Sequence, residues 1–276
     1  MLLTDYFHYY LSTYGGFLIT GFGVIGNVIN MLLFTQLKLF RKNQTTFYLT
    51  VAAMVDSCEL FLTAFMRAVT TEFDFDPTRT SLVWCKIRIY LIQIGSAISA
   101  IIVCLTAIDQ YLSTSHFTQL RQLSNIKSAQ RLVISFAILT ALYSIPTPIF
   151  QEIRRSTCVI YNPSYNYYYS FVHLCITIGL VPIIISSLFS FLSYQNVRRI
   201  VRRQIPIVRR RLDRQLTAMV LFRVALFVLT TLPFVIFRTY QTNRPVDQTD
   251  AYAVSVDQLI RTITTVFYHL NFAVSD

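Results

Sequence analysis

The chain has 276 residues, of which 54% are hydrophobic and only 13% are charged. Its mean hydropathy is +0.51 and its formal net charge is +11. Soluble domains carry about 25% charged residues, so this composition excludes an ordinary soluble domain and indicates a membrane protein.

Seven apolar segments follow one another along the chain, and each is long enough to cross a hydrocarbon core, which takes about 20 helical residues. The segments are continuously apolar and do not alternate with a period of two, which excludes a transmembrane β-barrel. The sequence therefore predicts an all-α membrane protein, a seven-transmembrane helix bundle over residues 15–275 that follows a short extracellular N-terminus, residues 1–14. The expected spans are residues 15–37, 46–69, 83–111, 129–150, 167–194, 214–238 and 252–275.

Basic residues predict the orientation of the bundle, since Lys and Arg accumulate in short cytoplasmic connections. One set of alternate connections holds fourteen of the 24 Lys and Arg, eight of them between residues 198 and 214. This pattern places the N-terminus outside. The flanking spans hold the 198–214 stretch at the membrane, which favours contact with membrane lipid over a nucleic-acid partner.

Two of the five cysteines, Cys85 and Cys158, fall on the outer side, one at the start of the third span and one in the second outer connection. Thiol pairs outside the cell are oxidised, so we expect a disulfide between them. Asp109 follows Cys85 by 24 residues, about 36 Å along a helix, which places Asp109 at the cytoplasmic end of the span.

Several short motifs follow one another in order along the seven spans. They are Gly26-Asn27, Ala52 with Asp56, Cys85, Asp109-Gln110-Tyr111, Pro182, Phe227 with Pro233, and Asn271. Jointly this set resembles the rhodopsin-like family of G-protein-coupled receptors from about residue 15 to residue 275, with invertebrate orphan receptors of the peptide-receptor type as the nearest likeness. The resemblance implies a multi-pass plasma-membrane receptor that transduces an extracellular ligand, expected to be a neuropeptide, to heterotrimeric G proteins.

The chain departs from the family pattern at four places, one of which is the fourth span, where the family's Trp is absent because the only Trp is Trp84. The family's Asp-Arg-Tyr reads Asp109-Gln110-Tyr111, and the Trp expected two residues before the proline of the sixth span is Thr231. The Asn-Pro of the last span reads Ser275-Asp276, and the chain stops without the family's Tyr and cytoplasmic tail helix, as in a truncated gene product. These departures keep open a second interpretation, a receptor-like membrane protein that binds ligand without coupling to a G protein.

Two prolines inside the spans mark expected bends, because each removes one backbone hydrogen bond from its helix. They are Pro182 and Pro233. With Phe227 and Thr231, they form the set of bend and switch positions that the resemblance implies.

Asp56 lies about midway through the second span, where an ionised carboxylate is costly unless it is paired or hydrated. The resemblance implies that Asp56 binds an allosteric sodium ion together with Ser99, and that Asn27, Asn271 and Ser275 complete the polar network. The alternative is a protonated or water-bridged Asp56 in a network without an ion.

Arg223 lies in the sixth span, ten residues before Pro233. Either its long side chain reaches the cytoplasmic interface, or it pairs with Asp109 and supplies the cation that Gln110 lacks. In the family, an acidic residue at the base of the sixth span holds the motif's Arg. Here Asp213 would receive only a neutral hydrogen bond from Gln110, which is weaker than a charge-assisted one.

The resemblance places a ligand cavity between the third, fifth, sixth and seventh spans. Ile92 stands where aminergic receptors carry an Asp, and His269 stands where opsins carry the Lys that binds retinal, so neither a monoamine nor retinal is expected. Outer carboxylates and tyrosines suit a basic or aromatic peptide. The candidate wall residues are Arg88, Ile92, Gln93, His173, Arg261 and His269.

Two other classes of protein fit the sequence less well. A small transporter would show an inverted repeat or a pair of unwound helices at matched positions, and neither is visible. An enzyme would need a nucleophile–base set or metal-ligand spacing, and the sequence offers none. Apart from the sodium ion, no cofactor is expected.

Overall fold

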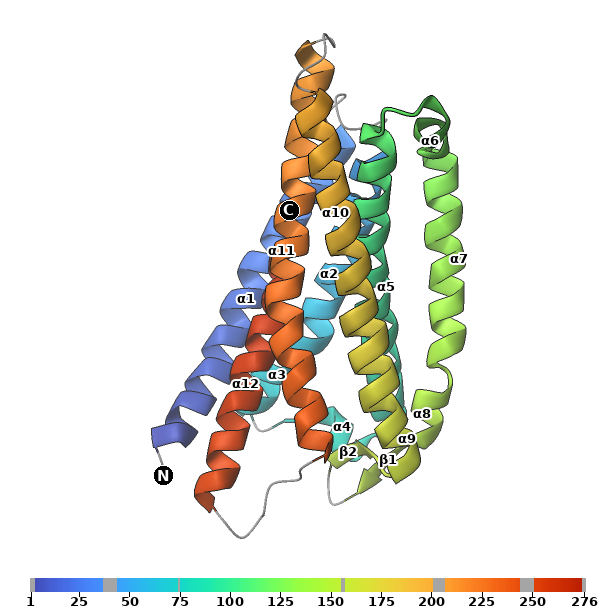
Figure 1. The fold of residues 1–276 in the computed structure, drawn as a ribbon. Coiled ribbons are helices and arrows are strands. Elements are labelled where there is room, and N and C mark those ends of the chain that lie inside the picture. The colour runs from blue at the N-terminus through green and yellow to red at the C-terminus, as the bar shows by residue number, and fades with distance from the viewer. Residues whose placement is uncertain are drawn as a thin grey trace.

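The computed structural model describes residues 3–36, 44–73, 75–154, 157–200, 207–243 and 251–274. Within them, long helices run side by side as one bundle, with a small two-stranded sheet at one end (Figure 1). The long rods are α1 (Leu3–Gln36); α2 (Gln44–Leu60) with the π-helical segment η1 (Phe61–Phe65) and α3 (Met66–Phe73); α5 (Leu82–Thr114); α7 (Ile126–Ser144); the π-helical segment η2 (Tyr169–Leu180) with α10 (Val181–Ile200); α11 (Ile207–Asn243); and α12 (Ala251–Ala273). The short elements are α4 (Pro77–Thr80), α6 (Thr118–Leu123), α8 (Pro146–Phe150), β1 (Gln151–Arg154), β2 (Thr157–Ile160) and α9 (Pro163–Tyr168).

The fold is the expected all-α, seven-helix membrane bundle. Six of the described helices are long and apolar enough to cross a membrane by length and composition. The seventh rod, α12, carries Asp257, Arg261 and His269, which lower its hydropathy. Helix α1 begins at Leu3. Residues 3–14, which were expected to form an extracellular N-terminus before the first span, are therefore part of the first helix.

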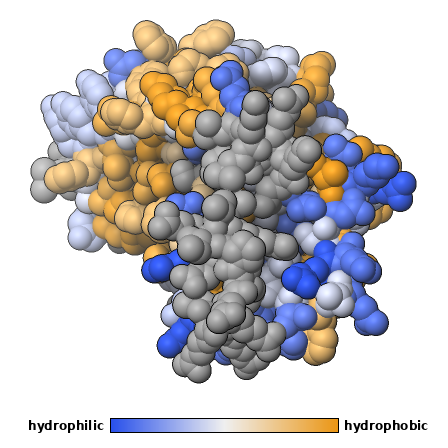
Figure 2. Space-filling view, turned by 90° about the horizontal axis from the view of Figure 1, so that it is seen from above, coloured by the Kyte–Doolittle hydropathy of each residue, from blue (hydrophilic) through white to orange (hydrophobic). Residues whose placement is uncertain are grey.

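The outward surface of the bundle is apolar, as lipid contact requires. On α7, Ile134, Ile138 and Leu142 are all more than half exposed. Figure 2 looks down on the inner end of the bundle, where apolar surface covers one side and hydrophilic residues gather on the other. Apolar side chains on the outside and polar ones at the end are the distribution expected of a membrane-spanning bundle.

Side-chain caps and prolines set several helix ends. The Asn125 side chain accepts a hydrogen bond from the Lys127 N–H at 2.8 Å and begins α7. The Ser81 hydroxyl accepts one from the Trp84 N–H at 3.3 Å and begins α5. Helix α7 ends at Ser144 because Pro146, the first residue of α8, has no N–H to continue the helical ladder.

Small residues on α5 let α11 approach closely, since an alanine leaves room for the side chains of a facing helix. Ala100, Val103 and Ala107 of α5 form a buried cluster with residues of α11. Those residues are Val220, Val224 and Phe227. The contact lies in the inner half of the bundle and couples any movement of α11 to α5.

A β-hairpin covers the outer end of the bundle beside α4, α8 and α9 (Figure 1). Strands β1 and β2 pair antiparallel, with Ile153 opposite Cys158. Cys158 forms a disulfide with Cys85 at the start of α5, with 5.9 Å between the two Cα atoms. This confirms the expected disulfide, which fastens the hairpin over the mouth of the bundle.

Candidate functional site

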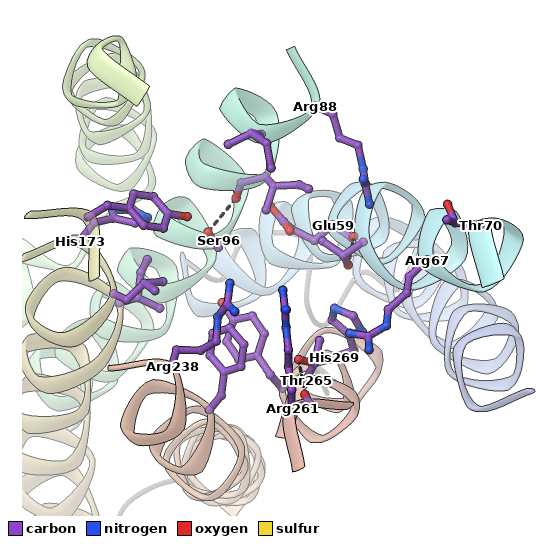
Figure 3. Close-up of a pocket in the computed structure, with 18 of the residues that line it drawn as sticks. Glu59, Arg67, Thr70, Arg88, Ser96, His173, Arg238, Arg261, Thr265 and His269 are labelled. Carbon is purple, nitrogen blue, oxygen red and sulfur yellow. Dashed lines mark hydrogen bonds between the residues drawn. The ribbon is translucent and has the colours of Figure 1, made fainter. Parts of the chain in front are cut away.

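A cavity of about 370 Å³ lies in the outer half of the bundle (Figure 3). Residues of α2, η1, α3, α5, η2, α11 and α12 line it. A second cavity of about 500 Å³ extends under the hairpin. The two cavities share the lining residues Ile89, Tyr169, Leu174, Arg238 and Arg261. They therefore adjoin and offer room for an elongated molecule.

Four arginines from four helical segments converge on the first cavity. They are Arg67 of α3, Arg88 of α5, Arg238 of α11 and Arg261 of α12 (Figure 3). Among the described residues, none of the four forms an ion pair with a carboxylate. The positive charge of Arg261 lies near those of Arg67 and Arg238, so the three groups repel one another.

Neutral groups hold these guanidinium groups in place. Arg67 donates from Nε to the Ser12 hydroxyl at 3.1 Å and from Nη2 to the Thr262 hydroxyl at 2.8 Å. Arg88 donates from Nε to the Leu62 carbonyl at 3.0 Å. Neutral acceptors orient an arginine without cancelling its charge, so the cavity stays electropositive.

The carboxylate of Glu59 forms part of the cavity wall near Ser96 (Figure 3). Glu59 is 2% exposed, and among the described residues no side chain donates a hydrogen bond to its carboxylate oxygens, which lie close to the backbone N–H of Ser96. The side chain lies directly against Gly95 of α5, where an added Cβ would overlap the carboxylate. Gly95 thus provides the space that Glu59 occupies, and a buried carboxylate without a side-chain donor can accept a hydrogen bond from a donor group on a ligand.

Five of the six predicted wall residues line this cavity, namely Arg88, Ile92, His173, Arg261 and His269. The sixth, Gln93, is 2% exposed but does not line it. The sequence interpretation missed Glu59, Arg67 and Arg238. A charged residue inside an apolar span was a usable signal for Glu59, whereas Arg67 and Arg238 lie near the ends of their expected spans, where a basic residue is ordinary.

Below the cavity, Asp56 of α2 is fully buried and accepts two hydrogen bonds. The Ser99 hydroxyl donates to Oδ1 at 2.7 Å. The Arg223 guanidinium donates from Nη2 to Oδ2 at 3.0 Å, which makes a buried ion pair between α11 and α2. Asn27 donates from Nδ2 to the Phe272 carbonyl at 3.0 Å, and Asn271 is buried. Ser275 lies outside the described residues.

Neither expected position of Arg223 is the observed one. The side chain is 3% exposed, so it does not reach the cytoplasmic interface. It is turned toward Asp56 in the centre of the bundle, while hydroxyl groups satisfy Asp109. Thr45 donates to Asp109 Oδ2 at 2.9 Å, and Ser124 donates to Oδ1 at 2.7 Å. Because Asp109 has these two donors, it does not need the arginine.

Gln110 joins three helices at the inner end. It is 1% exposed and donates from Nε2 to the Thr217 hydroxyl of α11 at 2.7 Å. Its Oε1 accepts a hydrogen bond from Thr45 of α2 at 3.2 Å. The neighbouring Tyr111 packs edge-on against Phe189 of α10, with ring centroids 5.5 Å apart. The side chain of Asp213 lies outside the described residues.

The family model for the 7 transmembrane receptor (rhodopsin family) matches residues 26–275. The match covers nearly the whole chain and confirms the predicted family. The chain is a member of the rhodopsin receptor family. A comparison with curated proteins found no significant match. The protein is thus a multi-pass receptor of the plasma membrane, and members of this family are receptors and not enzymes.

In this rhodopsin-family receptor, the predicted bend and switch residues lie between the outer cavity and the inner end. Pro182 is the second residue of α10, just after the π-helical segment η2, and its carbonyl accepts a hydrogen bond from the Ser186 hydroxyl at 2.6 Å. Pro233 lies inside α11. Phe227 belongs to the α5–α11 cluster, and Thr231 is fully buried. Their roles in movement remain predictions.

Proposed function

We propose that this receptor couples an extracellular ligand to a heterotrimeric G protein at its inner end. The observation that carries the proposal is that α11 is tied to the bundle at two levels below the outer cavity. Arg223 ties it to α2 through Asp56, and Thr217 ties it to α5 through Gln110. A ligand that contacts α11 at Arg238 and α2 at Glu59 acts on the same helices.

The mechanism is a shift between two populations. In the structure, the ties at Asp56 and Gln110 hold α11 against α2 and α5, which is the closed state. Agonist must bind the open state more tightly than the closed one, because only this difference in affinity shifts the equilibrium. Outward movement of α11 breaks both ties and opens a cleft between the inner ends of the helices for the G protein.

We also propose that Arg223 takes the place that the resemblance gives to sodium. The guanidinium already supplies a positive charge 3.0 Å from Asp56 Oδ2, and Ser99 satisfies Oδ1. A second cation there would add repulsion without a free carboxylate oxygen to bind. Added sodium should therefore leave agonist affinity unchanged in the unmodified receptor. A fall in agonist affinity with sodium that disappears in Asp56→Ala would contradict this.

A peptide is the ligand class that the cavity supports best. The two adjoining outer cavities, of about 370 and 500 Å³, run from Glu59 to the hairpin. Together they offer more room than a monoamine would fill, and Ile92 offers no carboxylate to bind an amine. The neuropeptide assignment remains a prediction.

A second candidate is a receptor that binds its ligand without coupling to a G protein, and Gln110 is the observation that favours it. A neutral amide with two N–H donors stands where the family has a guanidinium with five. In the closed state, both ends of this amide are already bonded, to Thr217 and Thr45.

The experiment that tests coupling is a peptide-library screen on cells that express the chain, read through reporters for several G-protein classes. The comparison variant is Arg223→Glu, which places a carboxylate against Asp56, breaks the tie to α2 and should raise the signal in the absence of ligand. Coupling predicts at least one ligand whose signal depends on the receptor. Ligands that bind the receptor but give no signal in any reporter would support the non-coupling candidate.

A further inference from the structure

The outer cavity has an unusual distribution of charge. Four arginines and two carboxylates line it, and the second carboxylate, Asp76, is already engaged. Asp76 pairs with Arg79 at 3.6 Å and accepts a hydrogen bond from the Thr78 N–H at 2.9 Å. Asp257, which lies near Arg238, accepts a hydrogen bond from Gln241 at 2.7 Å. The arginines therefore dominate the field inside the cavity.

From this arrangement we infer that the ligand carries an anionic oxygen group, a carboxylate or a phosphate, and a hydrogen-bond donor at its deeper end. Arg238, Arg261 and Arg67 bind the anion. Glu59 accepts the hydrogen bond. This inference rests on the proposed receptor function and names the chemistry of its ligand.

Guanidinium groups suit the anion because they donate two parallel hydrogen bonds to a carboxylate or phosphate. Three mutually repelling arginines in a cavity hold their positions at an electrostatic cost that an anion relieves. The neutral partners of Arg67 leave its charge available to a ligand. An anion placed among the three groups thus gains both hydrogen bonds and the removal of like-charge repulsion.

Glu59 indicates the second feature of the ligand. It is buried without a side-chain donor, and Gly95 leaves room for its carboxylate beside the cavity. Along the helical rod, Glu59 lies eight residues before Arg67, with the π-helical segment η1 between them, so Glu59 is deeper in the bundle than Arg67. An ammonium or amide group on the ligand would reach Glu59 while its acidic group stays among the outer arginines. The outer surface had favoured a basic or aromatic peptide, whereas the cavity favours an acidic group.

The test uses the full chain in lipid nanodiscs and measures thermal unfolding, which reports binding without a G protein. The first set of probes consists of tetrapeptides, each prepared in two forms, one with a free C-terminal carboxylate and one with a C-terminal amide. Small dicarboxylates and phosphate monoesters are tested separately as the second and third sets. We expect carboxylate forms to raise the melting temperature more than their amides. The set that stabilises most identifies the source of the anion as peptide, organic acid or phosphate.

Matched variants locate the binding. Arg238→Gln and Arg261→Gln should weaken the best anionic probe about tenfold each, the usual loss for one charge-assisted hydrogen bond. Arg261 is exposed, so its replacement should not disturb folding. Arg154→Gln removes the same charge from an exposed position on β1, outside both cavities, and should have no effect. Glu59→Gln should weaken probes with a free ammonium and spare the same probes when acetylated.

Three results would overturn the inference. The first is equal stabilisation by carboxylate and amide forms, or none by any anionic probe at millimolar concentration. The second is an equal loss in Arg154→Gln, which would reduce the effect to general electrostatics. The third is a neutral or cationic ligand that drives nucleotide exchange. Binding of anions without any exchange would instead contradict the coupling proposal and leave this inference standing.

Discussion

The buried pair between Arg223 and Asp56 gives the sharpest prediction for stability. Its charged atoms lie 3.0 Å apart, with side chains 3% and 0% exposed. At an effective dielectric constant of about 20, the Coulomb attraction at this distance is about 5.5 kcal/mol before desolvation is subtracted. Removing one partner of such a pair costs about 3–5 kcal/mol, because the remaining charge stays buried without compensation.

Arg223→Gln and Asp56→Asn should therefore each lower the melting temperature in nanodiscs by roughly 10 °C. The double variant carries two neutral amides that still hydrogen-bond, so it should recover most of this loss. Arg214→Gln removes an exposed charge from the same helix and should change stability by no more than about 0.5 kcal/mol.

A double-mutant cycle measures the coupling between the two side chains. We expect the double variant to lose clearly less than the two single variants together. If the loss of stability in the double variant equals the sum of the losses in the two single variants, the side chains do not interact. That result would contradict the proposed tie between α11 and α2.

Three further predictions concern other parts of the receptor. Cys158→Ser removes the disulfide to Cys85, which spans a sequence separation of 73 residues and contributes about 4 kcal/mol in the chain-entropy model. A reducing agent should then no longer lower the melting temperature of the variant. If the reducing agent lowers the melting temperature of the variant as much as that of the unmodified receptor, this disulfide is not the one it reduces. Gln110→Arg puts a larger, charged group into a site only 1% exposed, which should disfavour the closed state and raise basal nucleotide exchange. If the variant and the unmodified receptor give the same basal exchange, the amide of Gln110 does not restrain the receptor. Gly95→Ala should displace Glu59 and weaken the binding of ammonium-bearing probes about tenfold. Gly21→Ala is the control, because its added carbon has no neighbour within 4 Å, and it should not change binding. Equal effects of the two variants would show that Glu59 does not take part in binding.

Hydropathy predicted the bundle well because the bilayer imposes its constraint locally, span by span. The cysteine positions and the orientation rule likewise sufficed for the disulfide, since both cysteines lie on one side. The order of short motifs indicated the family that the family model matches. Helix α1 is longer than expected because tyrosines at its outer end, Tyr6, Tyr10 and Tyr14, stack along one face of the helix.

The pairing of Arg223 could not be predicted in the same way. The sequence gives the depth of a side chain along its helix, but the choice between Asp56 and Asp109 depends on the rotation of α11 and on hydroxyl donors from other segments. Thr45, which precedes Asp109 by 64 residues, and Ser124, in the connection after α5, satisfy Asp109. Such contacts become visible only when the helices are placed together.

The arginines of the cavity illustrate a second limit. Arg67 and Arg238 lie near the outer ends of their helices, where a basic residue has an ordinary role at the membrane interface. Their convergence with Arg261 arises from three separate helical segments packed around one cavity. Nothing in the local sequence of any one helix records that convergence.

The most direct test of the account is guanine-nucleotide exchange on purified heterotrimeric G proteins, with the receptor in nanodiscs and the most strongly stabilising probe bound. The account predicts that the probe accelerates exchange in the unmodified receptor and that Arg223→Gln raises exchange without it. Exchange that stays at the level of empty nanodiscs for every G-protein class, with the probe bound, would contradict coupling.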